Sequence, residues 1–98
     1  MNSMFNDLDP ALHSQIRLAI VSILVGAEEA EFSYLKEELN TTAGNLSFQI
    51  SKLQEAGYIK VNKGFKNNYP LTTLKLTVKG RKAFADYVNS IKSYLKLS

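Results

Sequence analysis

Carboxamide and hydroxyl side chains outnumber charged ones in the stretch from Thr41 to Ile59. Asn45 and Gln49 are four residues apart, so a helix would place them on one face. Each carboxamide offers a donor and an acceptor side by side, a pair that fits the edge of adenine in the DNA major groove. Ser47 can donate or accept. These residue types and their spacing predict a surface suited to contacting base edges.

Phe48 stands at the centre of the same predicted face and has two interpretations. Its ring can lie against thymine methyl groups. It can equally pack on the preceding helix or on a partner chain, because single exposed apolar residues are common. Lys52 adds a positive charge and Gly44 allows close approach to the sugar-phosphate chain. Thr42 can cap the helix, hold a phosphate at the helix N-terminus, or do both.

Residues that could build a catalytic or metal site are scarce in these 98 residues. There is no cysteine, which excludes disulfides and thiolate metal ligands. His13 is the only histidine, and beside Ser14 it supports neither a catalytic triad nor a metal site. Asp7 and Asp9 are interpreted as parts of an N-terminal arm and a helix cap. We therefore expect no enzyme activity, no catalytic residue, no bound metal and no cofactor.

Charge is distributed unevenly, although the net charge is only +3. Residues 1–56 hold eight acids and three bases, a net −5, whereas residues 57–98 hold nine bases and one acid, a net +8. A polyanionic partner and a solvated lysine-rich surface explain this asymmetry equally well. Phosphate contact is favoured for Lys63 and Lys66, which lie near a turn-rich stretch.

Helix caps and apolar spacing divide the chain into elements. Asp9 followed by Pro10 is typical of a helix start, and Thr77 suits the cap of a last helix. Ile59 and Val61 alternate with polar residues, which indicates a strand. The expected elements are a helix over 9–26, an acidic linker over 28–31, a short helix over 34–39 capped by Ser33, the polar-faced helix over about 42–56, strands over 58–63 and 71–77 joined by a loop over 64–70, and a last helix over 78–97.

The first and last helices carry more apolar surface than a small domain needs. The first has apolar stripes on two opposite faces, which predicts burial on both sides, and a second subunit could supply one of them. The alternative is that the last helix folds back and completes its own core. The residues expected at a dimer interface are Leu18, Val21 and Val25 in the first helix and Val88, Ile91, Tyr94 and Leu95 in the last.

Two short helices joined by a polar turn and followed by a basic hairpin describe a helix-turn-helix with a wing. Over roughly residues 8–95 the chain resembles the small winged-helix transcriptional regulators of the MarR and ArsR types. The stretches that carry this resemblance are "LDPALHSQIRLAIVSIL", "FSYLKEEL", "TTAGNLSFQISKLQEAGYI", "KGF" and "PLTTLKLTVKGRKAF".

The resemblance implies a mainly α fold with a small β-hairpin, a winged helix-turn-helix with long N- and C-terminal dimerisation helices. One domain would span residues 1–98, with an N-terminal arm over 1–8 and dimerisation helices over 9–26 and 78–97.

The resemblance also implies a sequence-specific regulator, a repressor, that binds a palindromic operator in double-stranded DNA as a homodimer. The helix over 42–56 would enter the major groove, and the wing over 63–70 would contact the backbone or the minor groove. Gln49 stands where relatives often have histidine, and Phe48 where they are often polar, so their base preference does not transfer. The positions that match DNA contacts are Thr41, Thr42, Asn45, Ser47, Phe48, Gln49 and Lys52 in the helix and Lys63, Lys66, Asn67 and Asn68 in the wing.

The alternative function is a winged-helix module that binds a partner protein without sequence-specific DNA binding, and Phe48 is its one support. The basic wing and the polar helix face favour DNA. The start, MNSMFNDLDP, is not a signal peptide, and the longest apolar stretch, AIVSILVGA, is too short to span a bilayer. We expect a cytoplasmic protein without membrane contact and without a separate ligand domain. A small-molecule effector at the dimer interface is compatible with the sequence.

Overall fold

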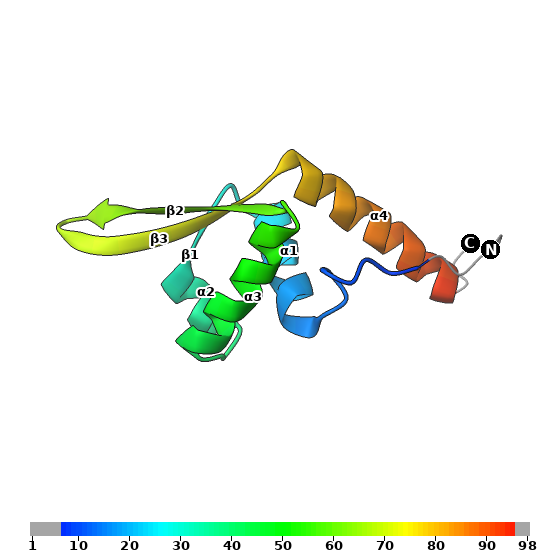
Figure 1. Cartoon of the computed structure of the whole chain (residues 1–98), viewed down its shortest axis with the longest axis horizontal. Helices are drawn as coiled ribbons and strands as arrows, with labels where there is room; N and C mark the ends of the chain where they lie inside the picture. Colours follow the sequence, from blue (N-terminus) through cyan, green and yellow to red (C-terminus); the bar gives the residue numbers. More distant parts are fainter. Residues whose placement is uncertain (1–6, 96–98) are drawn as a thin grey trace.

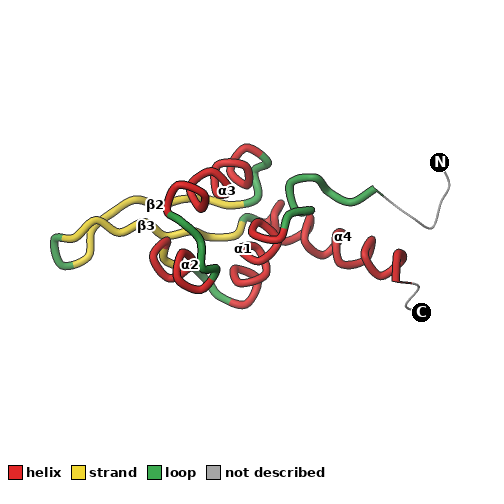
Figure 2. The backbone as a smooth tube through the Cα atoms, turned by 90° about the horizontal axis from the view of Figure 1, so that it is seen from below, coloured by secondary structure: helices red, strands yellow, loops and turns green. Residues whose placement is uncertain are grey.

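The computed structural model describes residues 7–95. Four helices and a three-stranded antiparallel sheet follow one another along the chain, and the hairpin and the last helix extend in opposite directions from the centre (Figures 1 and 2). The predicted mainly α fold with a helix-turn-helix and a wing is confirmed. The elements are α1 (Gln15–Gly26), β1 (Ala30–Glu31), α2 (Phe32–Glu38), α3 (Ala43–Glu55), β2 (Ile59–Lys66), β3 (Tyr69–Leu76) and α4 (Val78–Leu95).

The first helix begins later than predicted. Ser14, not Asp9, is its N-cap, and the Ser14 hydroxyl accepts from the backbone N–H of Arg17 at 3.4 Å. Asp9 caps a separate turn, because its carboxylate accepts from the backbone N–H of Ala11 at 2.9 Å. An N-cap residue suits a tight turn as well as a helix, so the local pattern could not separate the two. The helix expected over 9–26 is therefore a turn followed by α1.

A short strand that was expected to be an acidic linker completes the sheet. β1 pairs with β3 in antiparallel register, with Ala30 opposite Leu74, and the strand order is β1-β3-β2. Ala30 is 7% exposed, so this small apolar residue holds β1 against the core. As a consequence α2 starts at Phe32 rather than Tyr34, and Ser33 lies inside the helix instead of capping it.

The wing is paired almost to its tip, whereas residues 64–70 were expected to form a loop. Lys66 pairs with Tyr69, which leaves only Asn67 and Asn68 in the turn. Their φ angles are 52° and 67°. A two-residue hairpin turn of type I′ requires positive φ at both central positions, and asparagine tolerates that conformation well. The asparagine pair therefore lengthens both strands and extends the ribbon away from the core.

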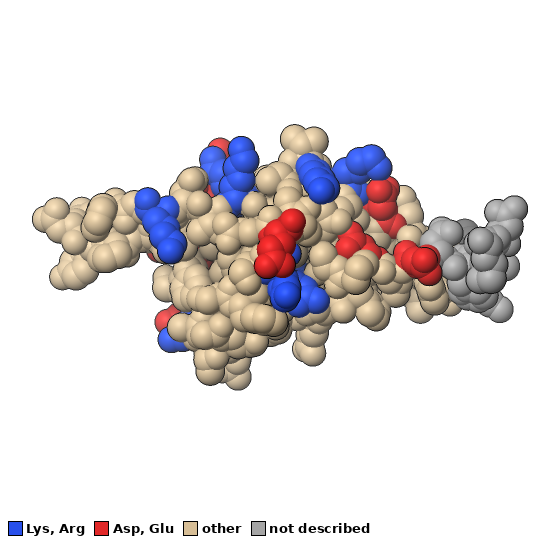
Figure 3. Space-filling view, viewed as in Figure 1, with Lys and Arg blue, Asp and Glu red and all other residues tan. Residues whose placement is uncertain are grey.

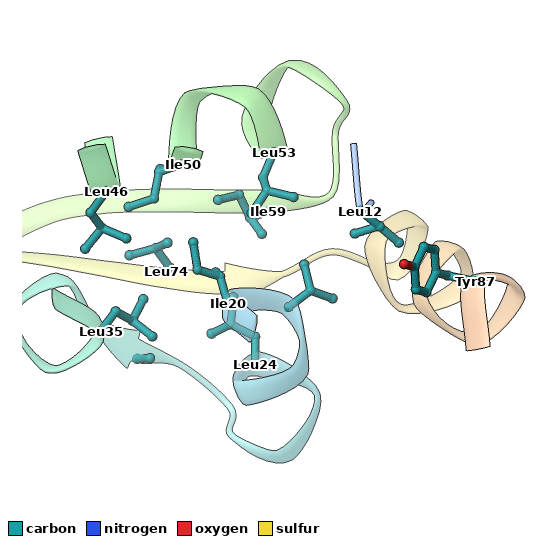
Figure 4. Close-up of a cluster of buried hydrophobic side chains, with 12 residues drawn as sticks. Leu12, Ile20, Leu24, Leu35, Leu46, Ile50, Leu53, Ile59, Leu74 and Tyr87 are labelled. Carbon is teal, nitrogen blue, oxygen red and sulfur yellow. The ribbon is translucent and has the colours of Figure 1, made fainter. Parts of the chain in front are cut away.

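The hydrophobic core lies between α1, α3 and the sheet, and α2 and α4 close it from two sides (Figure 4). Val21, predicted at a dimer interface, is fully buried inside its own chain (0% exposed) and offers no surface to a partner. The reason is that α1 contacts α3, β3 and α4, so most of its second apolar stripe is already covered. The buried residues are Leu12, Ile20, Val21, Leu24, Ala30, Leu35, Leu46, Ile50, Leu53, Ile59, Leu74 and Tyr87.

The last helix is anchored at its start and extends past the core (Figure 1). Thr77 caps it as predicted, because its hydroxyl accepts from the backbone N–H of Gly80 at 2.9 Å. Tyr87 reaches the core at 6% exposure, whereas Leu95, near the far end, is 62% exposed. The end that was expected at residue 97 lies outside the described residues. Among residues 7–95, no helix is long and apolar enough to cross a membrane.

Candidate nucleic-acid interface

α3 divides its side chains between the core and the surface. Leu46, Ile50 and Leu53 are buried, and this spacing leaves the predicted polar face outward. Thr42 caps the helix as predicted, with its hydroxyl accepting from the backbone N–H of Asn45 at 3.1 Å. Of the seven predicted residues, Thr42, Asn45, Ser47, Phe48 and Lys52 are exposed, and Thr41 and Gln49 are half-buried.

Three hydrogen bonds link four side chains across this surface. Arg17 Nη1, from α1, donates to Gln49 Oε1 at 2.5 Å. Gln49 Nε2 donates to Asn45 Oδ1 at 3.2 Å, and Asn45 Nδ2 donates to Thr41 Oγ1 at 2.8 Å. Arg17 was not among the predicted residues, because no local pattern indicates that α1 meets the outward face of α3.

This network changes the predicted chemistry of the two carboxamides. Bidentate pairing with adenine needs both the oxygen and the nitrogen of one amide. The oxygen of Gln49 already accepts from Arg17, and its nitrogen already donates to Asn45. The bond to Arg17 therefore fixes the orientation of the Gln49 carboxamide, and each of its two polar atoms keeps one further hydrogen-bonding site. Asn45 keeps a free lone pair on its oxygen, because a carboxamide oxygen can accept twice.

Phe48 is 55% exposed, so α2 does not cover it. Lys52 Nζ lies 5.2 Å from the centre of the Phe48 ring, within the range of a cation–π contact. The same ammonium group is 3.9 Å from a carboxylate oxygen of Glu55. This arrangement keeps a positive charge beside an apolar ring on the outward face of α3.

The two wing lysines point to opposite faces of the ribbon. Directly opposed residues of an antiparallel pair share a face, and successive residues alternate. Lys63 is opposite Thr72 and lies on the face of Val61, where it lines a groove of about 310 Å³ with Ser47 of α3. Lys63 is thus the wing lysine on the same side as the outward face of α3.

Lys66 lies on the other face of the ribbon, opposite Tyr69. It lines a separate groove of about 490 Å³ together with Glu29 and Glu31. Asn67 and Asn68 occupy the turn itself and are exposed.

The basic residues of the second half do not form one patch. Figure 3 shows lysine and arginine side chains in separate groups, with acidic side chains beside several of them. Lys60 and Lys75 are paired on the sheet face that points away from the core. Lys82 Nζ is 2.9 Å from Asp86 Oδ2, and Lys79 Nζ is 5.8 Å from the centre of the Tyr58 ring. Positive charge near the outward face of α3 therefore comes from few residues, namely Arg17, Lys52 and Lys63.

Two further polar contacts hold the turn that precedes α1. The Tyr58 hydroxyl donates to the carboxylate of Asp9. Burial, together with this hydrogen bond and the negative charge of Asp9, raises the pKa of Tyr58 to about 12. His13 Nδ1 lies 3.1 Å from the Tyr87 hydroxyl, which ties the turn to α4. Among residues 7–95, no group of three or more metal-ligating side chains could hold a metal ion.

Comparisons with known proteins agree with this geometry. The family model for a winged helix DNA-binding domain matches residues 16–95. An uncharacterised protein of Methanocaldococcus jannaschii is 42% identical over 79 residues, which are 81% of this chain and 86% of that protein. The structure of a transcriptional regulator homologue from Pyrococcus horikoshii OT3 superimposes with a TM-score of 0.81 at 28% identity, covering 88% of this chain and 85% of that one.

More distant structures share the fold. Lactococcus lactis ZitR, a zinc-responsive MarR family member, has a TM-score of 0.65 at 17% identity, covering 99% of this chain and 67% of ZitR. A mutant of ZitR has also been solved in complex with DNA, with a TM-score of 0.66. The chain thus shares its fold with MarR-type regulators.

Proposed function

Since the chain belongs to the winged helix DNA-binding domain family, we propose that it is a sequence-specific transcriptional regulator that binds a palindromic operator in double-stranded DNA as a homodimer. The family and fold are those of DNA-binding transcriptional regulators and not of enzymes. The proposed role is that of a repressor, because a protein bound across a promoter blocks access without further contacts.

The observation that carries this proposal is the outward face of α3. It is polar, exposed and nearly uncharged at its centre. Proteins recognise base edges with hydrogen-bond donors, acceptors and apolar contacts to methyl groups, and this face offers all three. In the proposed complex α3 lies in the major groove. Asn45, Ser47, Phe48 and Gln49 face the bases, while Thr41, Thr42 and Lys52 lie nearer the phosphates.

The wing supplies contacts of a different kind. A ribbon with Lys63 on one face and Lys66 on the other can meet phosphates on both sides of a minor groove. Asn67 and Asn68 stand at its tip, where the carboxamide groups are exposed. Both faces of the wing would thus contribute affinity that does not depend on sequence.

The proposed dimer uses the end of α4 and the exposed side of α1. Leu18 of α1 and Phe84, Val88 and Ile91 of α4 line an apolar groove of about 340 Å³. Beyond that groove Tyr94 is 41% and Leu95 is 62% exposed. A symmetric partner would cover this surface and place two recognition helices about 34 Å apart, one turn of DNA. Val25, which is half-buried, lies at the margin of the proposed interface.

A mobility-shift assay tests the proposal directly. The DNA is the region upstream of the gene that encodes this chain, compared with random DNA of equal length at two salt concentrations. We expect preference for the upstream DNA at both concentrations, because base contacts persist when phosphate contacts weaken. Equal binding to both DNAs would overturn the proposal. A module for protein partners would instead show no DNA preference and would lose its partner on Phe48→Ala.

A further inference from the structure

We propose that Arg17 of α1 is a specificity-determining residue that acts through Gln49. It fixes the Gln49 carboxamide so that an N–H group, and not the oxygen, faces the DNA bases. Arg17 here is a positioning residue, because it touches Gln49 and not the base. This inference rests on the proposed function, in which α3 lies in the major groove.

The guanidinium group of Arg17 is held firmly by the chain. Its Nε donates to the carbonyl of Ala11 at 2.7 Å, and its Nη2 donates to the carbonyl of Pro10 at 3.3 Å. Its remaining nitrogen, Nη1, donates to Gln49 Oε1 at 2.5 Å. The turn before α1 therefore aims one N–H group of Arg17 across at α3, and each of the three nitrogens has a partner.

This contact determines which atom of Gln49 faces outward. A guanidinium group only donates, so the atom of Gln49 that faces it must be the oxygen. The amide nitrogen then lies on the other side, where it gives one hydrogen to Asn45 Oδ1 at 3.2 Å. An amide nitrogen carries two hydrogens, and the second remains for DNA.

The DNA base that Gln49 contacts in the proposed complex is thereby restricted. A single N–H donor pairs with acceptors of the major groove, namely purine N7, guanine O6 or thymine O4. It is repelled by the amino group of cytosine, which offers only a donor there. A Gln49 that could rotate freely would accept either kind of base edge. Arg17 would thus convert an ambiguous side chain into a selective one.

Gln49→Glu provides the sharpest test. A carboxylate has nearly the same shape as the amide and still accepts from Arg17, but its outward atom is an oxygen that only accepts. Selection from random DNA followed by sequencing should show one position per half-site changing from acceptor-bearing bases to cytosine, which offers only an amino donor in the major groove. An unchanged preference at every position would overturn the proposal.

Arg17→Met tests the same contact from the other side. With the amide free to rotate, discrimination at that one position should fall about tenfold or more, within the range of a single base contact, while binding to random DNA is retained. In a Gln49→Ala background the same substitution should change discrimination no further, because the residue it positions is absent. Lys60→Met removes an equal charge on the sheet face away from the core and should leave the preference unchanged.

Three other outcomes are possible, and each has its own meaning. A loss of binding that is equal on all sequences, with a salt slope flattened by about one, would show that Arg17 contacts phosphate and would overturn the proposal. If Arg17→Met does not fold, as judged by circular dichroism, Gln49→Glu still decides, because it keeps the contact with Arg17 and loses only the exposed hydrogen bond to Asn45. If the wild-type protein selects no sequence at all, the proposed function itself fails.

Discussion

Tyr58 illustrates how single residues hold the N-terminal turn to the body of the protein. Its hydroxyl donates to Asp9, and its backbone carbonyl accepts from the N–H of Thr77 at 2.9 Å. It therefore connects the turn before α1, the start of β2 and the cap of α4. Burial and the Asp9 contact raise its pKa from 10.0 to about 12.

We expect Tyr58→Phe to lower the free energy of unfolding by about 1 kcal/mol at neutral pH, the typical contribution of one hydrogen bond. The folded-state pKa is the higher one, so the stabilisation is complete below pH 10 and is lost as the pH rises through 12. Urea unfolding of both proteins between pH 7 and about 12 should show their difference shrinking over the last two units. If the difference in unfolding free energy stays constant over this pH range, the hydroxyl of Tyr58 is not its source.

Replacing glycine by alanine should have opposite effects on stability at Gly80 and at Gly44. A Cβ at Gly80 would clash with the backbone carbonyl of Tyr58 and lie 2.8 Å from Leu76 Cδ1, whereas a Cβ at Gly44 would meet nothing within 4 Å. We expect Gly80→Ala to destabilise the protein by about 1–3 kcal/mol through overpacking. Gly44→Ala should stabilise α3 by about 0.5–1 kcal/mol. Urea midpoints measure both, and a stabilised Gly80→Ala would contradict the close packing of α4.

Local signals account for the residues that the sequence predicted correctly. Thr42 and Thr77 are caps that bond to a backbone N–H three residues later, so a short window contains the whole interaction. Asp9 has the same chemistry but caps a turn, which the same window cannot distinguish. Arg17 was missed because its contact with Gln49 joins residues 32 positions apart. The sequence therefore predicted which residues lie on the outward face of α3, but it did not predict how their side-chain amides are oriented.

At the scale of elements, the wing separates its lysines by face and by position along the ribbon. Replacing Lys63 and Lys66 by alanine should weaken binding to all DNA similarly and flatten the dependence of log K on log salt by about one to two units. Lys63→Ala alone should account for most of this change, because Lys63 lines a groove with Ser47 of α3, whereas Lys66 lies on the opposite face of the ribbon.

A matched control for the wing comes from the same ribbon. Lys60 and Lys75 are paired at its base, on the face that points away from the core. Their double alanine variant removes the same charge and should leave the salt slope unchanged. If both double variants flatten the slope equally, the effect belongs to overall charge and not to the wing.

Two elements departed from the sequence prediction for reasons of pairing. β1 is two residues long, too short for any periodic signal, and it exists because β3 offers it a partner. The wing strands extend further than predicted because Asn67 and Asn68 form the turn, whereas the whole stretch of turn-forming residues had suggested a loop. α3, by contrast, was predicted within one residue, since its cap and its apolar spacing agree.

At the scale of the whole molecule, the chain covers the apolar residues of α1 more completely than those at the end of α4. α1 is covered mainly by its own chain, and Val21 belongs to the core. α4, with 18 residues, would extend about 27 Å at 1.5 Å per residue. Tyr87 is its buried contact with the core, and Phe84 and Ile91 pack against the core one turn before and one turn after it. Leu95 at its end is 62% exposed, which leaves apolar surface that the proposed dimer would cover.

The proposed homodimer predicts a mass change that depends on the end of α4. Ile91 lines the groove between α1 and α4, and Leu95 is 62% exposed beyond it. Replacing both by aspartate places two charges in a surface that a partner would bury, and burying unpaired charges is strongly unfavourable. Light scattering of the wild type should give twice the chain mass of 11.0 kDa, and the variant should give the single mass with its helicity retained.

A control with the same chemistry separates the interface from a general effect of charge on α4. Val78 is 89% exposed at the start of the helix, and Ala85 is exposed at its middle. Changing both of these residues to aspartate should leave the dimer intact, because neither lines the groove. A wild-type mass near 11 kDa that does not change as concentration rises would rule out the dimer. The regulator would then have to recognise a single half-site, and the base selection should yield one motif without an inverted copy one turn away.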